Sequence, residues 1–448
     1  MNHKPLHTPL AAQTWEHVQT WSRLDQACLG VFDCPHTTPT LTDDGPFVAR
    51  SQDIRGRVFD YRNAGRVSEE TYAERITRAE PEYGDLLYSR EGTYFGIAAE
   101  IPKHTRICLG QRMVLIRPDP ARLDHRFLRY WLNSPTMEGH LAGFRDGSVA
   151  ERLNMATIRA LPVPLFPLPA QRKIATILGA LDDKIEMNRK TAATLEAMAR
   201  ALYRAWFVDF DPVWAKLEGR APAHMEPATA ALFPDSFGDD GLPEGWCFRT
   251  LSEVCTQIKE TVKPMGAPDA PFWHFSLPAY DAAATPVLEY GAAIKSNKGF
   301  VPNNAILFSR LNPAIPRIWW SRYDHTKGMP AASTEFYVAK ARTPQEVSWL
   351  YCLLSSAEFL EHAQSRVTGT SNSHQRVTPS ALAEIEVTDS PEAILNAFGA
   401  IAGPFFERTH ALKAESQTLA ALRDSLLPRL MSGELRVGEA REQIEEVA

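Results

Sequence analysis

Cationic side chains gather in three stretches of this sequence that contain no aspartate or glutamate. The stretches span residues 101–118, 291–323 and 362–383 of the 448-residue chain. Lysine and arginine attract phosphates, and arginine, asparagine and glutamine read base edges through two-point hydrogen bonds. The first two stretches stand at matching places in the two halves of the chain, which favours DNA contact. A chance absence of acids, with Trp319-Trp320 in a core, is the alternative interpretation.

A Ser-Arg pair follows a predicted strand in each half. Leu87-Tyr88-Ser89-Arg90 matches Leu307-Phe308-Ser309-Arg310. A loop with glycine after the strand would bring backbone amides to a phosphate, and a strand-end turn with a surface arginine is the competing interpretation. The residues predicted to contact DNA are Ser89, Arg90, Gly92, Thr93, Lys103, Arg106, Arg112, Lys295, Lys298, Ser309, Arg310, Arg317, Arg322, Gly369, Thr370 and Arg376.

None of the common catalytic or cofactor-binding motifs occurs in the sequence. It has no HExxH, no CxxC pair, no GxxxxGK[S/T] phosphate loop, no GxSxG elbow and no GxGxxG loop after a strand. Asp209-Phe210-Asp211-Pro212 resembles the Asp/Asn-Pro-Pro-aromatic loop of amino-methyltransferases but lacks its second proline. The 13 histidines show no metal-ligand spacing. We therefore expect no catalytic residues, no metal site and no cofactor in this chain.

The composition is that of a folded protein of two or three domains, with 44% hydrophobic and 23% charged residues. Six scattered cysteines favour a reducing, cytoplasmic location, and no apolar stretch is long enough to cross a bilayer. The formal net charge of −6 resides in an acidic segment at 209–243 and an acidic tail at 434–448. The rest of the chain is weakly basic, so the overall charge does not argue against a DNA partner.

Two heptad ladders, about 220 residues apart, are the clearest sign of an internal duplication. Leu24-Asp25-Gln26-Ala27-Cys28 and Leu251-Ser252-Glu253-Val254-Cys255 repeat at a similar distance. Because each seam needs an apolar partner, we predict an antiparallel intramolecular coiled coil, with Pro404 kinking or interrupting its second helix. The ladders consist of Ile174, Leu178, Leu181, Ile185, Asn188, Ala192, Leu195, Ala199, Leu202 and Trp206, and of Ile394, Phe398, Ile401, Phe405, Arg408, Leu412, Glu415, Leu419, Leu422 and Leu426.

Short β-like runs alternate with helical ones ahead of each ladder. We therefore predict an α+β (mixed α/β) fold of two pseudo-symmetric globular domains joined by the two long helices. The predicted segments are a first globular domain at 1–166, a spacer helix at 167–208, an acidic linker at 209–242, a second globular domain at 243–390, a spacer helix at 391–430 and an acidic tail at 431–448. Two diverged domains predict a split DNA target with unlike halves.

Five motifs stand in a fixed order around the predicted helices. They are Pro167-Leu168-Pro169-Ala170-Gln171-Arg172-Lys173-Ile174, Trp206-Phe207-Val208-Asp209-Phe210-Asp211-Pro212-Val213, Leu232-Phe233-Pro234-Asp235-Ser236-Phe237, Leu242-Pro243-Glu244-Gly245-Trp246 and Leu426-Leu427-Pro428-Arg429-Leu430-Met431-Ser432-Gly433-Glu434-Leu435. Together they resemble the specificity subunits of type I restriction-modification systems over nearly the whole chain. The second helix departs from the pattern, because Ser390-Pro391-Glu392-Ala393 lacks the Gln171-Arg172 pair that starts the first.

The resemblance implies a non-catalytic subunit whose two domains each read one half of a bipartite double-stranded DNA site. It implies two kinds of partner: two modification subunits that methylate adenine and dock on the spacer helices, and restriction subunits that hydrolyse ATP and cut DNA. S-adenosylmethionine, ATP and magnesium would belong to those partners. A related methylation-based phage-defence system without a standard restriction subunit, and a structural coiled-coil adaptor, remain alternatives.

Overall fold

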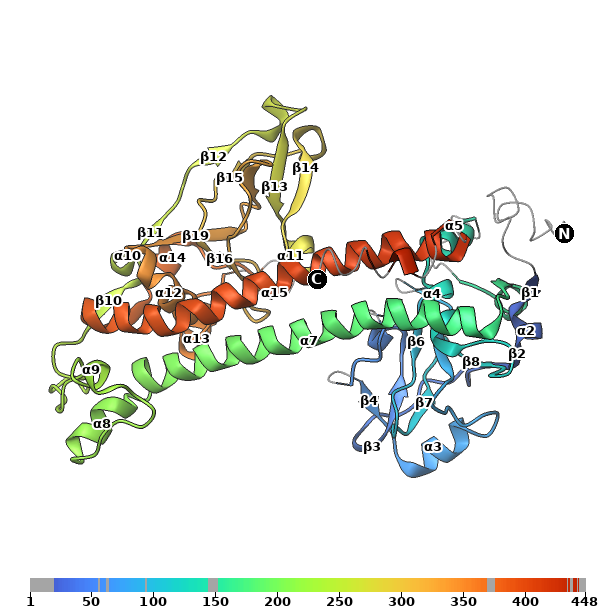
Figure 1. The fold of residues 1–448 in the computed structure, drawn as a ribbon. Coiled ribbons are helices and arrows are strands. Elements are labelled where there is room, and N and C mark those ends of the chain that lie inside the picture. The colour runs from blue at the N-terminus through green and yellow to red at the C-terminus, as the bar shows by residue number, and fades with distance from the viewer. Residues whose placement is uncertain are drawn as a thin grey trace. The chain divides into compact units, whose positions relative to one another are not determined.

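The computed structural model describes residues 20–54, 57–61, 64–92, 95–143, 152–368, 375–432, 434–435, 438–440 and 442. The chain divides into two compact units, of which unit 1 comprises residues 1–187 and 415–448 and unit 2 comprises residues 188–414. Each unit combines a globular domain with parts of two long helices, α7 (Leu168–Phe207) and α15 (Glu392–Ser432) (Figure 1). Within the described ranges no helix is both long and apolar enough to span a membrane.

Unit 1 is built on a four-stranded antiparallel sheet of order β2-β8-β5-β6, with a three-stranded sheet, β4-β3-β7, beside it in the chain. β5 and β8 are the central strands of the four-stranded sheet, and almost all their side chains are buried. Their continuous apolar runs suit this buried position. The elements are β1 (Trp21–Arg23), α2 (Leu24–Ala27), β2 (Cys28–Asp33), β3 (Thr42–Ala49), the 3-10 helix η1 (Ser51–Ile54), β4 (Gly65–Arg66), α3 (Glu69–Arg75), β5 (Leu86–Ser89), β6 (Ala98–Glu100), β7 (Ile107–Leu109), β8 (Met113–Pro118), α4 (His125–Leu132), α5 (Pro135–Ala142), α6 (Met155–Arg159) and β9 (Pro162–Pro164).

Unit 2 has a four-stranded sheet of order β11-β19-β16-β17 and a five-stranded sheet of order β12-β15-β18-β13-β14. Its elements are α8 (Asp211–Leu217), α9 (Pro227–Ala230), β10 (Cys247–Thr250), α10 (Leu251–Val254), β11 (Cys255–Gln257), β12 (Thr261–Val262), η2 (Pro264–Gly266), β13 (Pro271–Phe275), α11 (Leu277–Ala283), β14 (Val287–Tyr290), η3 (Gly291–Ala293), β15 (Lys298–Gly299), β16 (Ile306–Ser309), β17 (Ile318–Trp320), β18 (Met329–Ala332), β19 (Phe336–Ala341), η4 (Pro344–Glu346), α12 (Val347–Leu354), α13 (Ala357–Ser365), α14 (Pro379–Ala383) and β20 (Glu386–Asp389).

The two units repeat one arrangement of elements. A strand, a short helix and a second strand open each domain, as β1-α2-β2 in unit 1 and β10-α10-β11 in unit 2. The opening strand pairs antiparallel with the last strand of its domain, β9 or β20. The four-stranded sheets have equivalent strand orders. The predicted α+β fold with duplicated domains is thereby confirmed.

Within each unit the segments of α7 and α15 run antiparallel. In unit 1, Asp182 of α7 accepts a hydrogen bond from Arg423, late in α15. In unit 2, Trp206 at the end of α7 packs on Phe398, early in α15, with ring centroids 5.9 Å apart. The predicted coiled-coil pairing is thus confirmed within each unit. The α7 seam follows the predicted ladder, with Ile174, Leu178, Leu181, Asn188, Ala192, Ala199 and Trp206 buried and Ile185, Leu195 and Leu202 partly buried.

The α15 seam differs from the predicted register in its middle. Ile401 and Arg408 are exposed, so their assignment to the seam was wrong. The cause is a second contact, because Phe406 packs against Trp320 and Tyr351 of the domain, with ring centroids 5.2 and 5.1 Å apart. The helix therefore shares its apolar surface between α7 and the sheet domain. The buried positions here are Phe398, Ala402, Phe406, Thr409 and Leu412, with Phe405 only partly buried.

The predicted interruption at Pro404 does not occur, because α15 is one helix from Glu392 to Ser432. Pro404 is exposed. Proline has no N–H to donate to the carbonyl group of Ala400, one turn earlier, and Ala400 is exposed as well. Water can therefore donate to that carbonyl group, which removes part of the usual cost of a proline inside a helix.

The segment after each long helix packs onto the unit in which that helix ends. Val213, Phe233 and Leu242 of the acidic linker belong to the core of unit 2. Leu435 and Ala440, after α15, belong to a core of unit 1. Both acidic segments are therefore anchored by apolar side chains, while their described carboxylate groups are exposed.

Candidate nucleic-acid interface

The Ser-Arg pair after β5 lies inside its domain. The Arg90 side chain is 4% exposed, and its Nη1 donates a hydrogen bond to Asp33 Oδ1 at 2.9 Å. Ser89 and its counterpart Ser309 in unit 2 are also buried. Arg90 would have to leave its ion pair in order to reach a phosphate, so this geometry favours a role in holding the turn over direct DNA contact.

Arg310, the counterpart of Arg90, is used in the same way. Its guanidinium donates to the backbone carbonyls of Thr334 at 2.6 Å and Val377 at 3.5 Å. Burial lowers the pKa of Arg310 despite the nearby carboxylate of Glu335. That carboxylate pairs with Arg376 at 3.0 Å. Arg90 and Arg310 therefore each connect chain segments that are distant in the sequence.

Most of the remaining predicted arginines form surface ion pairs. An exposed pair contributes little to stability, so a phosphate can replace the carboxylate at small cost. The pairs are Arg106 with Glu69 at 2.7 Å and Arg112 with Glu91 at 3.5 Å. Arg317 also pairs with Asp281, at 2.6 Å, but its side chain is only 15% exposed and is less available to a phosphate.

Cations also lie over aromatic rings in both units. Lys103 Nζ is 4.9 Å from the ring centre of Tyr83, and the Arg322 guanidinium is 5.3 Å from that of Trp320. Gly92 has a φ of +89°, which favours glycine. Thr93, Gly369 and Thr370, also predicted as DNA contacts, lie outside the described residues.

Four lysines gather at one edge of the five-stranded sheet of unit 2, which we call the lysine edge. The edge strand β12 pairs with β15. Lys259 and Lys263 flank β12, and Lys295 and Lys298 precede and begin β15. None of the four forms an ion pair with another described residue, although Glu260 stands between the first two. The lysine edge thus carries the unneutralised positive charge that phosphate binding requires.

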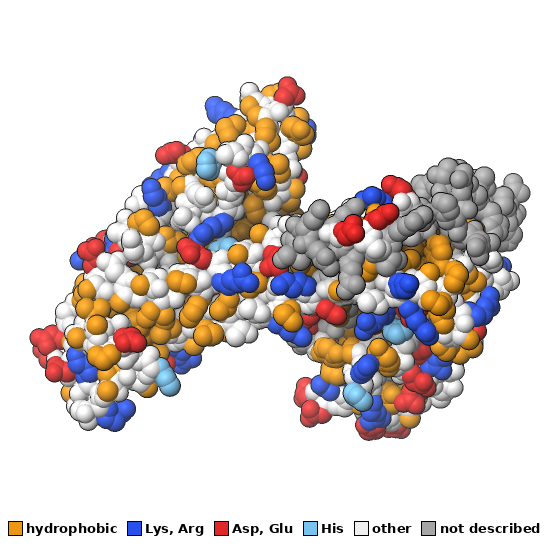
Figure 2. Space-filling model, viewed as in Figure 1, with side chains coloured by type: hydrophobic (Ala, Val, Ile, Leu, Met, Phe, Trp, Pro, Cys, Tyr) orange, Lys and Arg blue, Asp and Glu red, His pale blue; other side chains and the backbone are white. Residues whose placement is uncertain are grey.

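Two exposed apolar side chains stand beside the lysine edge. Met265 of η2 is 51% exposed and Tyr290, just before η3, is 65% exposed. The η2 turn, which carries Met265, and the η3 turn, which follows Tyr290, pack closely against each other. A Cβ atom added to Gly291 of η3 would lie 2.3 Å from backbone oxygens of the η2 turn. Figure 2 shows Lys and Arg, Asp and Glu, and hydrophobic side chains interspersed over the part of unit 2 that contains this sheet. Cations beside an exposed apolar tip are typical of surfaces that contact DNA grooves.

The sequence pattern indicated Lys295 and Lys298 but missed Lys259 and Lys263. A stretch free of acids is too strict a criterion, because Glu260 lies between the two missed lysines. The available signal was their spacing around a short β-like run. Only the pairing of β12 with β15 brings the two lysine pairs to one edge.

Asp33, Cys34 and His36 are the one group of potential metal ligands found among the described residues, with ligand atoms within 4.8 Å of one another. Asp33 is already paired with Arg90. Burial raises the pKa of the Cys34 thiol, although backbone hydrogen bonds oppose this. A neighbouring guanidinium and a protonated thiol both disfavour a bound cation.

Comparisons with known proteins agree with these features. The type I restriction modification DNA specificity domain matches residues 44–197. The HindI specificity subunit of Haemophilus influenzae is 25% identical, covering 79% of this chain and 86% of that protein. The MjaIX specificity subunit of Methanocaldococcus jannaschii is 24% identical over 85% of this chain and 84% of its own length. Over most of its length the chain is therefore similar to type I specificity subunits.

A solved structure shares the fold of this chain. The crystal structure of a type I S subunit from M. genitalium matches with a TM-score of 0.52 at 15% identity, over 92% of this chain and 95% of that one. Specificity subunits of type I restriction enzymes recognise DNA and are not themselves catalytic.

Proposed function

We propose that this chain is a specificity subunit that reads a bipartite, asymmetric DNA site, with one half-site for each globular domain. The observation that carries the proposal is the duplicated fold, in which equivalent sheets present different side chains. Two domains of one fold with unlike surfaces suit two unlike half-sites. In unit 2 the lysine edge supplies phosphate contacts, and these set the register for base contacts.

The paired helices serve as the scaffold for two adenine methyltransferase subunits and for ATP-dependent restriction subunits. Large apolar side chains that remain exposed on α7 support this role. Met187 is 63% exposed and Met198 is 48% exposed. Flexible, exposed methionines are frequent on protein-binding surfaces. S-adenosylmethionine, ATP and magnesium are the cofactors of those partners.

The division of labour follows from the chemistry each subunit offers. This chain selects the site through phosphate and base contacts, while the methyltransferase receives an adenine turned out of the base stack. Binding by this chain depends on salt, because each phosphate that is neutralised releases counterions.

The test is to co-express this chain with its modification subunit in a host without DNA methylation and to map N6-methyladenine by single-molecule sequencing. We expect methylation at one split, asymmetric motif and none when this chain is omitted. A complex that forms without producing methylation would contradict the proposal and favour a structural adaptor.

A further inference from the structure

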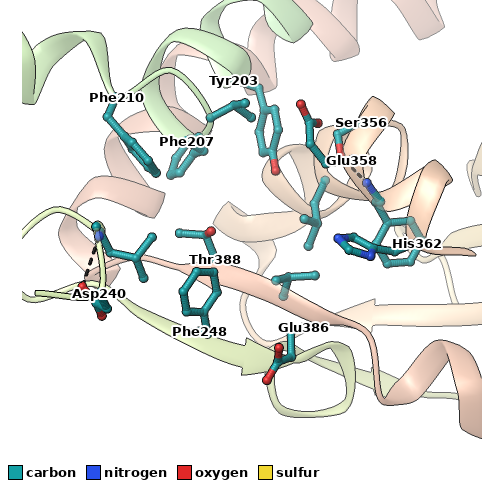
Figure 3. Close-up of a pocket in the computed structure, with 16 residues that line it drawn as sticks. Tyr203, Phe207, Phe210, Asp240, Phe248, Ser356, Glu358, His362, Glu386 and Thr388 are labelled. Carbon is teal, nitrogen blue, oxygen red and sulfur yellow. Dashed lines mark hydrogen bonds between the residues drawn. The ribbon is translucent and has the colours of Figure 1, made fainter.

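Unit 2 contains a pocket of about 390 Å³ that includes none of the residues predicted to contact DNA. This volume lies within the range of about 300–1,000 Å³ that is typical of binding pockets. The pocket is bounded by the end of α7, the acidic linker, α13 and the strands β10 and β20 (Figure 3). Tyr203, Phe207, Phe248 and His362 project into it from these separate elements (Figure 3).

The charge of the pocket wall is negative. Asp240, Glu358 and Glu386 line it, and all three are exposed. The described lining residues include no lysine or arginine. Arg366 lies nearby but is not part of the lining, and its Nη1 donates to the backbone carbonyl of His362 at 3.0 Å. A phosphate would be repelled by the three carboxylates, whereas a cation would be attracted.

Aromatic rings form the other walls. Tyr203 and Phe207 are stacked with ring centroids 5.2 Å apart and an interplanar angle of 28°. Phe248 is 54% exposed on β10, and Phe359 closes the pocket from α13. Aromatic faces attract cations, and the planar guanidinium of arginine also stacks on such rings while it pairs with carboxylates.

An apolar strip leads out of the pocket along the acidic linker. Phe210, in the lining, contacts Phe237 with ring centroids 6.2 Å apart, and Phe237 contacts Trp214 at 4.5 Å. Trp214 is 48% and Leu217 is 51% exposed. Exposed aromatic and aliphatic side chains next to a pocket are typical of surfaces that bind another polypeptide.

We propose that this pocket and the adjoining strip dock a segment of the modification subunit that inserts an arginine side chain between the aromatic walls and the three carboxylates. The strip would contact apolar residues that flank the inserted arginine. The proposal rests on the proposed function, because it assumes that the partner is a subunit of the assembly. It adds the chemistry of one contact, a cationic anchor in an acidic, aromatic pocket.

The test compares the affinity of the purified full chain and its variants for the purified modification subunit. In the E358Q/E386Q variant two carboxylates lose their charge but keep their shape, and we expect at least a tenfold weaker complex. In the F248R variant a cation of this chain competes for the pocket, and we expect a loss of the same order.

The matched control is E361Q/E384Q. Glu361 and Glu384 are exposed carboxylates on and near the same elements, and neither lines the pocket. The control changes the net charge by the same amount, so we expect affinity like that of the unmodified chain.

Three outcomes would overturn the proposal. In the first, E358Q/E386Q and F248R bind as tightly as the unmodified chain. In the second, E361Q/E384Q weakens the complex equally, so that net charge and not the pocket is responsible. In the third, spermidine or N-acetylarginine amide raises the melting temperature of the unmodified chain but not of E358Q/E386Q, while subunit affinity is unchanged in both. That last result would assign the pocket to a small cation. Site-specific methylation by the unmodified assembly, measured in parallel, tests the proposed function separately.

Discussion

The carboxylate of Asp182 on α7 accepts a hydrogen bond from the guanidinium of Arg423 on α15 at 2.7 Å. The same carboxylate accepts hydrogen bonds from the Tyr130 hydroxyl at 2.6 Å and from Arg129 at 2.9 Å. Tyr130 and Arg129 lie on α4 of the sheet domain. One side chain therefore joins both long helices to the domain of unit 1.

Replacing Asp182 by asparagine should destabilise unit 1. Arg423 and Arg129 would lose a charged acceptor, although Asp424 and Glu100 still pair with them. We expect a loss of about 2 kcal/mol in the free energy of unfolding, the order of a hydrogen bond to a charged group. Urea titration at pH 7 measures it. D183N is the control, because Asp183 is exposed on the same helix, and an equal loss there would refute the explanation.

The same carboxylate predicts a pH dependence. Burial alone would raise the pKa of Asp182, but Arg129, Tyr130 and Arg423 outweigh it and lower the pKa below its usual value of 3.8. A lowered carboxyl pKa contributes stability that is complete above the unfolded value and is lost as the pH falls through the folded value. At pH values below about 4, the free energy of unfolding should therefore decrease. This decrease should be smaller in the D182N variant.

Arg90 should prove structural. The R90A variant leaves Asp33 without its buried partner, and we expect a loss of about 3 kcal/mol in the free energy of unfolding. The R112A variant, whose ion pair is exposed and 3.5 Å long, should lose less than about 1 kcal/mol. Thermal melting of both variants decides between the roles. An R90A chain that melts normally but binds DNA weakly would instead restore Arg90 as a DNA contact.

Lys263 and Lys298 should contribute to DNA affinity without selecting a sequence. Each K→A change at the lysine edge should weaken binding to all duplexes alike and reduce the slope of log affinity against log salt concentration by about 1. Fluorescence anisotropy at several salt concentrations measures this. Lys340 is the control, because it is exposed on β19 of the other sheet. An unchanged slope in K263A and K298A would remove the lysine edge from the DNA interface.

Tyr290 should affect selection more than general affinity. Its ring is 65% exposed, and the next residue, Gly291, packs against the η2 turn that follows Lys263. Exposed apolar side chains can insert at base steps. We expect the Y290A variant of the full assembly to methylate sites that differ from the original motif in one half. V287A is the control, because Val287 is a 47% exposed apolar residue at the other end of β14. A methylation map identical to that of the unmodified assembly would exclude Tyr290 from base recognition.

The sequence by itself determined the duplication, the α+β class, the two long helices and the resemblance to specificity subunits. These features depend on local periodicity and on motifs that lie at the ends of elements. They can therefore be predicted without knowing which surfaces pack together in the fold. The α7 seam followed its heptad ladder for this reason. The α15 seam did not, because Trp320 and Tyr351 compete with α7 for the same apolar face.

Only the tertiary structure decided which cations are available to DNA. Arg90 pairs with an acid 57 positions away in the sequence, and Arg376 with one 41 positions away. A charge count along the chain cannot detect such neutralisation, because folding brings the partners together. The same pairing of distant segments collected Lys259, Lys263, Lys295 and Lys298 at one sheet edge. Whether a cation is left without an acidic partner depends on contacts between distant segments, whereas helical periodicity depends on residues that are close in the sequence.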